Sequence, residues 1–149
     1  RKVNYHLTIC GGGPLKGELS KEIEKRGLTN RVSLLGNIDR SIVYKNLSNS
    51  CVYISTSLTE GFGNSNIEAM ASGSPVVVTD ILINTEIINF QNLTFPVGDY
   101  RELSNIVIKL CNDEKHFRMV AMNGLEKSKY FSLEFTANSY HSSYIENKL

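Results

Sequence analysis

The 149-residue chain lacks the features that mark several large classes of protein. Its 16 Lys and Arg and 15 Asp and Glu residues nearly balance and are interspersed, so no basic patch for nucleic acid or an anionic membrane is expected. Its apolar runs are too short to span a bilayer. It has no internal repeat, linker or low-complexity tract. A chain of this size fits one α/β domain that buries roughly 68–70% of its unfolded surface.

Cysteine is scarce, and the three cysteines show no metal-ligand spacing: Cys10, Cys51 and Cys111. An odd number of thiols without a disulfide framework predicts a reduced, cytoplasmic chain with buried thiols. The three histidines are scattered, and no Asp-x-Asp pair occurs. We therefore expect neither a metal nor a cofactor.

Strand and helix patterns alternate along the chain. Strands are expected near 6–10 and 32–35, at Val52, and near 76–79 and 93–97. Helices are expected near 15–26, 41–49, 85–89, 101–111, 115–128 and 133–146, with a further helix inside 60–78. This alternation predicts a Rossmann-like parallel sheet with helices on both faces.

The stretch 60–78 is the most informative part of the chain. It places Glu60, a glycine turn, a helix start, Glu68 and the buried-strand pattern Pro75-Val76-Val77-Val78 in a fixed order. The preceding residues 51–55 read as a buried strand, so the turn follows a strand's carboxyl end, where open parallel sheets bind ligands. Gly61 and Gly63 permit positive φ or close backbone approach.

Asn64 and Ser65 stand where the next helix begins, as a cap or as its first turn. Bare amides at a helix amino terminus attract an anion, and the dipole alone contributes on the order of 1–2 kcal/mol to binding a diphosphate there. Glu68 lies about one turn further on, where its carboxylate can accept hydrogen bonds from vicinal hydroxyls of a ribose or sugar. Such charge-assisted bonds contribute roughly 1.5–3 kcal/mol each.

The spacing of the two glutamates is poor evidence by itself. Glu126 and Glu134 have the same separation, and no glycine turn accompanies them. The surrounding Gly-Phe-Gly, Ala-Met-Ala-Ser-Gly and Pro-Val-Val-Val segments distinguish the first pair. Ala69 and Met70 keep the helix slim, and Gly73 is expected to end it as a left-handed cap.

The stretch resembles the E-x7-E signature of the GT-B glycosyltransferases of the "glycosyl transferases group 1" family. Residues 7–14, ending in Gly-Gly-Gly-Pro, resemble that family's strand ending in G-x-G-P, and 31–36 resemble its R-V-x-F-L-G strand. The resemblance extends to about Asp113. It implies the C-terminal, donor-binding half of a GT-B fold and a retaining transfer from a nucleotide-diphosphate sugar to a saccharide or lipid-linked acceptor.

The resemblance also implies roles for residues at matching positions. Glu60 corresponds to the catalytic glutamate near the donor sugar, and Glu68 to the ribose-binding glutamate. The remaining nucleotide-sugar-binding positions lie in two glycine turns, one strand end and the helix start: Gly12, Gly13, Gly36, Asn37, Ile38, Gly61, Phe62, Gly63, Asn64 and Ser65. The family commonly has aliphatic residues where this chain has Asn64-Ser65-Asn66, and we interpret these polar side chains as helix caps in preference to phosphate contacts.

The family's donor domain normally opens with a strand and helix that carry a diphosphate-binding arginine and lysine, and neither Arg1 nor Lys2 stands in that motif. The first residue is not methionine. We therefore expect residues 1–149 to be a single sugar-nucleotide-binding domain, a fragment without its first strand–helix unit and its N-terminal acceptor domain, and inactive alone. The full-length protein is a candidate for peripheral membrane association.

Other functions are less well supported. A noncatalytic nucleotide-sugar-binding module would have the same residues. A nucleotide-sugar epimerase of similar shape has a different signature. A dinucleotide fingerprint fails on register, because its third glycine would fall at Lys16 and no acid closes the strand that follows.

Overall fold

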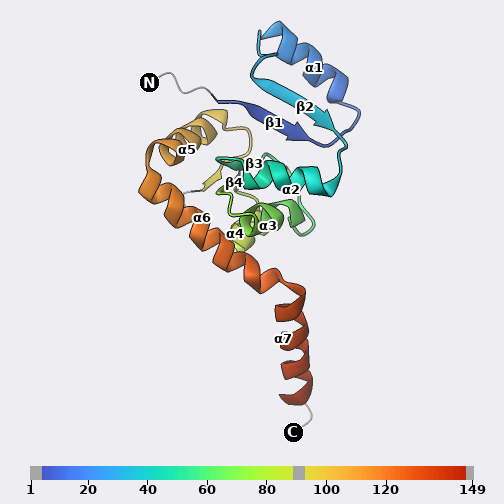
Figure 1. Cartoon of the computed structure of the whole chain (residues 1–149), viewed down its shortest axis with the longest axis vertical. Helices are drawn as coiled ribbons and strands as arrows, with labels where there is room; N and C mark the ends of the chain where they lie inside the picture. The colour runs from blue at the N-terminus through green and yellow to red at the C-terminus, as the bar shows by residue number, and fades with distance from the viewer. Residues whose placement is uncertain (1–4, 89–92, 147–149) are drawn as a thin grey trace. The chain divides into compact units, whose positions relative to one another are not determined.

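The computed structural model describes residues 5–88 and 93–146, and the chain divides into two compact units, 1–43 and 44–149. The first part of the chain contains β1 (Leu7–Cys10), α1 (Lys16–Lys25), β2 (Val32–Gly36) and α2 (Arg40–Ser48). The signature region contains β3 (Tyr53–Ser55), α3 (Asn64–Ala71), β4 (Val76–Thr79), α4 (Leu82–Ile88) and β5 (Thr94–Phe95). The chain continues with α5 (Tyr100–Asn112), α6 (Glu114–Ser128), the 3-10 turn η1 (Lys129–Phe131) and α7 (Leu133–Glu146) (Figure 1).

The first unit is built on a parallel pair of strands. β1 pairs with β2 so that Leu7 lies opposite Val32, and α1 packs on β2. The pairing continues past the strand ends, where the amide of Gly11 donates to the carbonyl of Gly36 at 2.7 Å. This bond brings the glycine turn after β1 to the carboxyl end of β2.

The second unit contains a parallel sheet in the order β3-β4-β5. The central strand β4 is buried along its whole length, as expected for a parallel strand covered on both faces. Helices α3, α4 and α5 all contact strands of this sheet. The expected class, parallel strands flanked by helices, is therefore confirmed.

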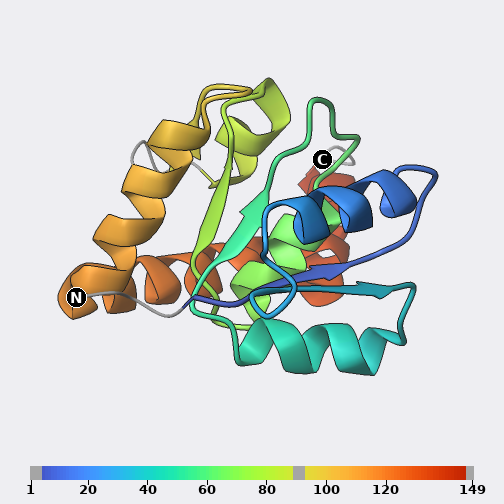
Figure 2. The ribbon, with the colours of Figure 1, turned by 90° about the horizontal axis from the view of Figure 1, so that it is seen from above.

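Helix α3 is held between the sheet and α6. Ala69 and Met70 are 0% and 1% exposed, and Figure 2 shows α6 running past α3. The two helices approach closely, and a Cβ on Gly124 of α6 would lie only 3.3 Å from Met70 Cγ. At the end of the helix Gly73 has φ 76° and donates its amide to the Met70 carbonyl, which confirms the predicted left-handed cap.

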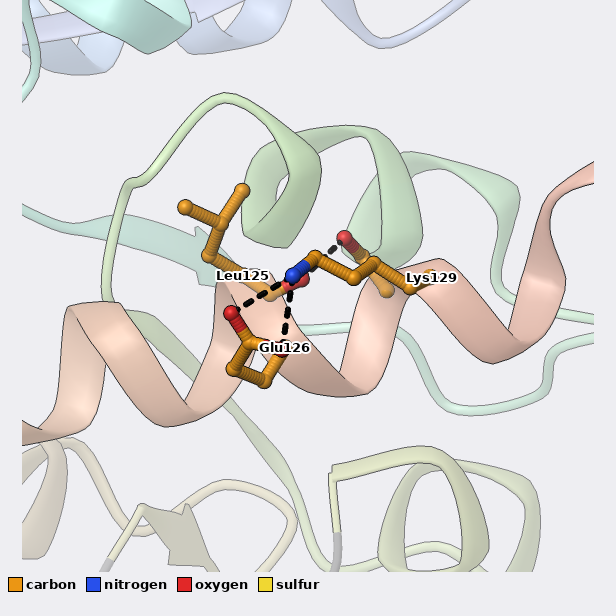
Figure 3. A network of polar contacts seen from close by, with 4 residues as sticks. Leu125, Glu126 and Lys129 are labelled. Atoms are coloured by element: carbon orange, nitrogen blue, oxygen red, sulfur yellow. Dashed lines mark hydrogen bonds and ion pairs between the residues drawn. The ribbon is translucent and has the colours of Figure 1, made fainter.

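The comparison pair of glutamates lies on two separate helices. Glu126 on α6 is exposed and accepts hydrogen bonds from Lys129 Nζ at 2.7 Å through both carboxylate oxygens (Figure 3). Glu134 is exposed in the first turn of α7. The pair Glu126 and Glu134, which has the same spacing but no glycine turn, therefore forms no site, and Glu126 is part of an ordinary surface ion pair.

The predicted bounds of two elements require correction. The short helix starts at Leu82 and not near residue 85, because the amides of Asn84 and Thr85 both donate to the Ile81 carbonyl; its expected end, Asn89, lies outside the described residues. The strand expected at 93–97 is only Thr94–Phe95, because Pro96 has no amide proton to continue the ladder.

The thiols are not buried as predicted. Cys10 and Cys51 are exposed, and Cys111 is intermediate. Cys51 precedes the first residue of β3, and Cys10 lies at the end of a strand whose side chains are mostly exposed.

Within residues 5–88 and 93–146, no helix combines the length and the apolar character that crossing a bilayer requires.

Candidate functional site

The signature turn lies at the carboxyl end of β3 and leads directly into α3. Gly63 occupies the N-cap position with φ 71°, in the left-handed region, and its carbonyl accepts from the amides of Asn66 and Ile67. No side chain caps the helix. Among the described residues, no acceptor faces the amides of Asn64 and Ser65, so these two donors are available to an anion.

The absence of a side-chain cap corrects the interpretation of Asn64-Ser65-Asn66. Gly63 takes the capping position, and Asn64 and Ser65 form the first turn with exposed side chains. Asn66 is 1% exposed, and its Nδ2 donates to Asn84 Oδ1 at 2.9 Å. Asn66 is therefore a buried polar residue. The sequence did not indicate this, because Asn66 follows two polar residues that are exposed.

Glu60 lies in the loop before the glycine turn and is partly buried. Its Oε1 accepts a hydrogen bond from Ser57 Oγ at 2.7 Å, and Ser55 Oγ donates to Ser57 Oγ at 3.2 Å. A short row of hydroxyls therefore leads from the end of β3 to the carboxylate.

Glu68 lies in the second turn of α3 and is also partly buried. Its Oε1 accepts from the hydroxyl of Tyr44 at 3.3 Å. A carboxylate offers several lone-pair sites, and hydroxyl groups are suitable donors to them.

Tyr53 shows that the two glutamates act on one region. Burial raises the pKa of its hydroxyl, the hydrogen bond with the Ser65 side chain lowers it, and the negative charges of Glu60 and Glu68 raise it further. Tyr53 therefore stays neutral at physiological pH. The same phenol is hydrogen-bonded to Ser65 in the first turn of α3 and is affected by the charges of both carboxylates, so all three groups act on one hydroxyl.

Phe62 is half exposed in the signature loop, and its ring makes an edge-to-face contact with Phe131 of η1, with centroids 6.0 Å apart. Gly61 has open space around its Cβ position and is not among the residues with positive φ, so the predicted need for glycine holds for Gly63 alone.

The other predicted positions belong to the first unit. Gly12 lies against the side chain of Asn37, which a Cβ on Gly12 would approach to 3.0 Å. A Cβ on Gly36 would lie 2.8 Å from Lys16 Nζ. Gly13 is in the exposed turn before α1, and Ile38 follows β2 and is partly buried. Gly12, Gly36 and Asn37 thus lie at the carboxyl ends of β1 and β2.

Metal ligation has no support in the described ranges, where His, Cys, Asp and Glu side chains form no group of three that could hold an ion.

Comparison with known proteins identifies the class to which this arrangement belongs. The sequence profile described as "Glycosyl transferases group 1" matches residues 1–127. The chain belongs to that family.

Individual relatives agree with this assignment. The chain is 28% identical over 144 residues to the O-antigen chain mannosyltransferase C of Escherichia coli, covering 93% of this chain and 38% of that protein. Its fold matches sucrose-phosphate synthase from Thermosynechococcus elongatus with a TM-score of 0.80 at 24% identity, over 95% of this chain and 38% of that one. It matches Anabaena Alr3699/HepE, solved in complex with UDP, with a TM-score of 0.80 at 22% identity, over 97% and 41% of the two chains. The chain thus spans well under half of each of these proteins.

Proposed function

We propose that this chain binds the nucleotide-diphosphate sugar from which a glycosyltransferase transfers its sugar to a saccharide or lipid-linked acceptor. The observation that supports this most directly is the grouping of the unpaired Asn64 and Ser65 amides with Glu60 and Glu68 around Tyr53. Two donors and the helix dipole suit a diphosphate, and carboxylates suit sugar hydroxyls.

The two glutamates have different neighbours, and this supports separate roles. Glu68 is on α3 itself, one turn beyond the amides, which suits the ribose next to the diphosphate. Glu60 is in the loop on the other side of the helix start, which suits the transferred sugar, where its charge would stabilise the oxocarbenium-like transition state. Phe62, Gly61 and Gly63, which lie between the two glutamates in the sequence, would form the wall of this site. Retention of configuration stays a proposal that rests on the family resemblance.

In the proposed reaction the bond between the sugar's anomeric carbon and the diphosphate oxygen breaks, and the acceptor hydroxyl oxygen forms the new bond to that carbon. The chain's contribution is to position the donor and to stabilise the departing diphosphate at α3. No metal or cofactor is required by these residues. The acceptor would be held by an N-terminal domain of the full-length protein.

The free thiols support a proposal for the cellular compartment in which the chain acts. Cys10 and Cys51 are free and exposed, and exposed unpaired thiols are typical of a reducing compartment. We propose that the chain acts in the cytoplasm, with any membrane association of the full-length protein peripheral.

Calorimetric titration with UDP-glucose, GDP-mannose and ADP-glucose tests the proposal. We expect saturable binding of one of these donors with one site per chain, and weaker or no binding of the other two. The nucleoside monophosphate with the same base is the control, and it is expected to bind more weakly because it lacks the second phosphate. Binding of the monophosphate as tightly as the donor, or no binding of any donor, would contradict the proposal.

The main alternative, a noncatalytic module, needs a second measurement. A noncatalytic module would bind the donor in the same way, so turnover must be measured in the full reading frame. Hydrolysis or transfer by the full-length protein supports the transferase, and tight binding without either supports the module.

A further inference from the structure

Four polar residues form a chain of hydrogen bonds that runs beneath the candidate site. Asn66 Nδ2 donates to Asn84 Oδ1 at 2.9 Å, and Asn84 Nδ2 donates to Thr79 Oγ1 at 3.2 Å and to the Thr79 carbonyl at 3.0 Å. Thr79 Oγ1 then donates to the carbonyl of Ser57 at 2.6 Å. Asn66, Asn84 and Thr79 are 1%, 0% and 1% exposed.

The donor and acceptor roles in this row of hydrogen bonds are fixed at one end. The Ser57 carbonyl can only accept, so the Thr79 hydroxyl must donate to it and present its lone pairs to Asn84. The amide nitrogen of Asn84 therefore faces Thr79, and its oxygen faces Asn66, which must donate. Asn66 Oδ1, at the far end, is buried and has no partner among the described residues.

The end at Ser57 leads to the proposed catalytic group. The hydroxyl of Ser57 donates to Glu60 at 2.7 Å, so Thr79 fixes the backbone of the residue whose side chain holds the carboxylate. The large apolar side chains of this loop offer little anchoring, because Leu58 is 70% exposed and Phe62 is 53% exposed. Buried hydrogen bonds therefore have a large share in holding the loop.

These hydrogen bonds also join three elements of the second unit. Asn66 is on α3, Asn84 on α4, and Thr79 at the end of β4. Through these bonds the start of α3, where the diphosphate is proposed to bind, is tied to the loop of Glu60. These bonds therefore add a buried connection between the two halves of the proposed donor site to the one that the backbone of residues 60–64 provides.

We infer that Thr79, Asn84 and Asn66 are positioning residues that hold the Ser57–Glu60 turn and so set where the Glu60 carboxylate meets the donor sugar, an inference that rests on the proposed function. A purely structural role would lower stability and would affect bare nucleotide and nucleotide sugar alike. A positioning role affects the sugar selectively.

The matched substitutions Thr79→Val and Thr79→Ser test this inference. Valine has nearly the shape of threonine without the hydroxyl, and serine keeps the hydroxyl. The measurement is calorimetric affinity for the tightest-binding pair among UDP and UDP-glucose, GDP and GDP-mannose, and ADP and ADP-glucose. We expect Thr79→Val to keep affinity for the bare diphosphate within about twofold and to lower the affinity for its sugar form about fivefold, and Thr79→Ser to restore it.

Two further variants keep the test decisive. Ser57→Ala removes the bond to Glu60 at a partly exposed position, and we expect the same selective loss even if Thr79→Val folds poorly. Asn105→Ala is the control, because Asn105 is exposed on α5 and its side-chain amide donates to Glu102. It is expected to leave both affinities unchanged.

The outcomes separate this inference from the proposed function. A wild-type chain that binds no nucleoside diphosphate or sugar form overturns both. The positioning role alone is overturned if the wild-type chain binds and the variants Thr79→Val and Ser57→Ala show either of two results. Either they keep the full gain in affinity that the sugar gives, or they lose affinity for the bare diphosphate and for its sugar form equally.

Discussion

Glu68→Ala lowers the affinity of the chain for the bare nucleoside diphosphate by about tenfold to hundredfold. The reason is the loss of the charge-assisted hydrogen bonds that the ribose hydroxyls would donate to the carboxylate, a net loss of roughly 1.5–3 kcal/mol in total. Glu68 is partly buried and held by Tyr44, so its oxygens are already placed and little ordering is needed on binding. Calorimetry with the bare diphosphate measures the effect.

Glu60→Ala gives the opposite pattern and is the matched comparison. It should leave bare diphosphate affinity within about twofold and remove most of the affinity gained from the sugar, because Glu60 lies in the loop and not on the helix that binds the phosphates. Equal loss of bare diphosphate affinity in the two variants would contradict this division of roles. Glu126→Ala, a surface acid in the ion pair with Lys129, should change neither affinity.

Gly63→Ala destabilises the fold by about 1–3 kcal/mol, the range for a residue forced into the left-handed region and into an overpacked site. Gly63 has φ 71°, and a Cβ there would lie 3.0 Å from both Asn66 Nδ2 and Ile87 Cδ1. Both neighbours are buried and cannot easily move. The free energy of unfolding, measured by denaturant titration, gives the size of the loss.

Gly61→Ala is the control for this prediction, since a Cβ at Gly61 meets nothing within 4 Å. Its expected cost is within about 0.5 kcal/mol, the usual range for an exposed position. If the two alanine variants unfold at the same denaturant concentration, the close packing around Gly63 is not what the structure indicates.

The sequence predicted the signature region well because its determinants are local. Gly63, Gly73 and the run Pro75 to Val78 each specify their own turn, cap or strand within a few residues, and the structure has each in its expected place. The class of fold followed from the alternation of such patterns.

The parts that sequence analysis missed depend on pairs far apart in the chain. Asn66 and Asn84 are 18 residues apart and become partners only when α4 is in place beside α3. Tyr53 was predicted to be a buried strand residue, and the effect of the Glu60 and Glu68 charges on its hydroxyl arises only once α3 packs against β3. A polar residue in the sequence does not reveal which distant group will satisfy it, which is why Asn66 was interpreted as a cap.

The most direct test of the account is to record which backbone amides of the chain shift in two-dimensional ¹⁵N NMR spectra as the tightest-binding nucleoside diphosphate is added. We predict that within the signature region the largest shifts fall on Asn64 and Ser65, with smaller ones toward Glu68. The amides around Glu126 and Glu134 are expected not to shift. Saturable binding that leaves Asn64 and Ser65 unchanged would contradict it.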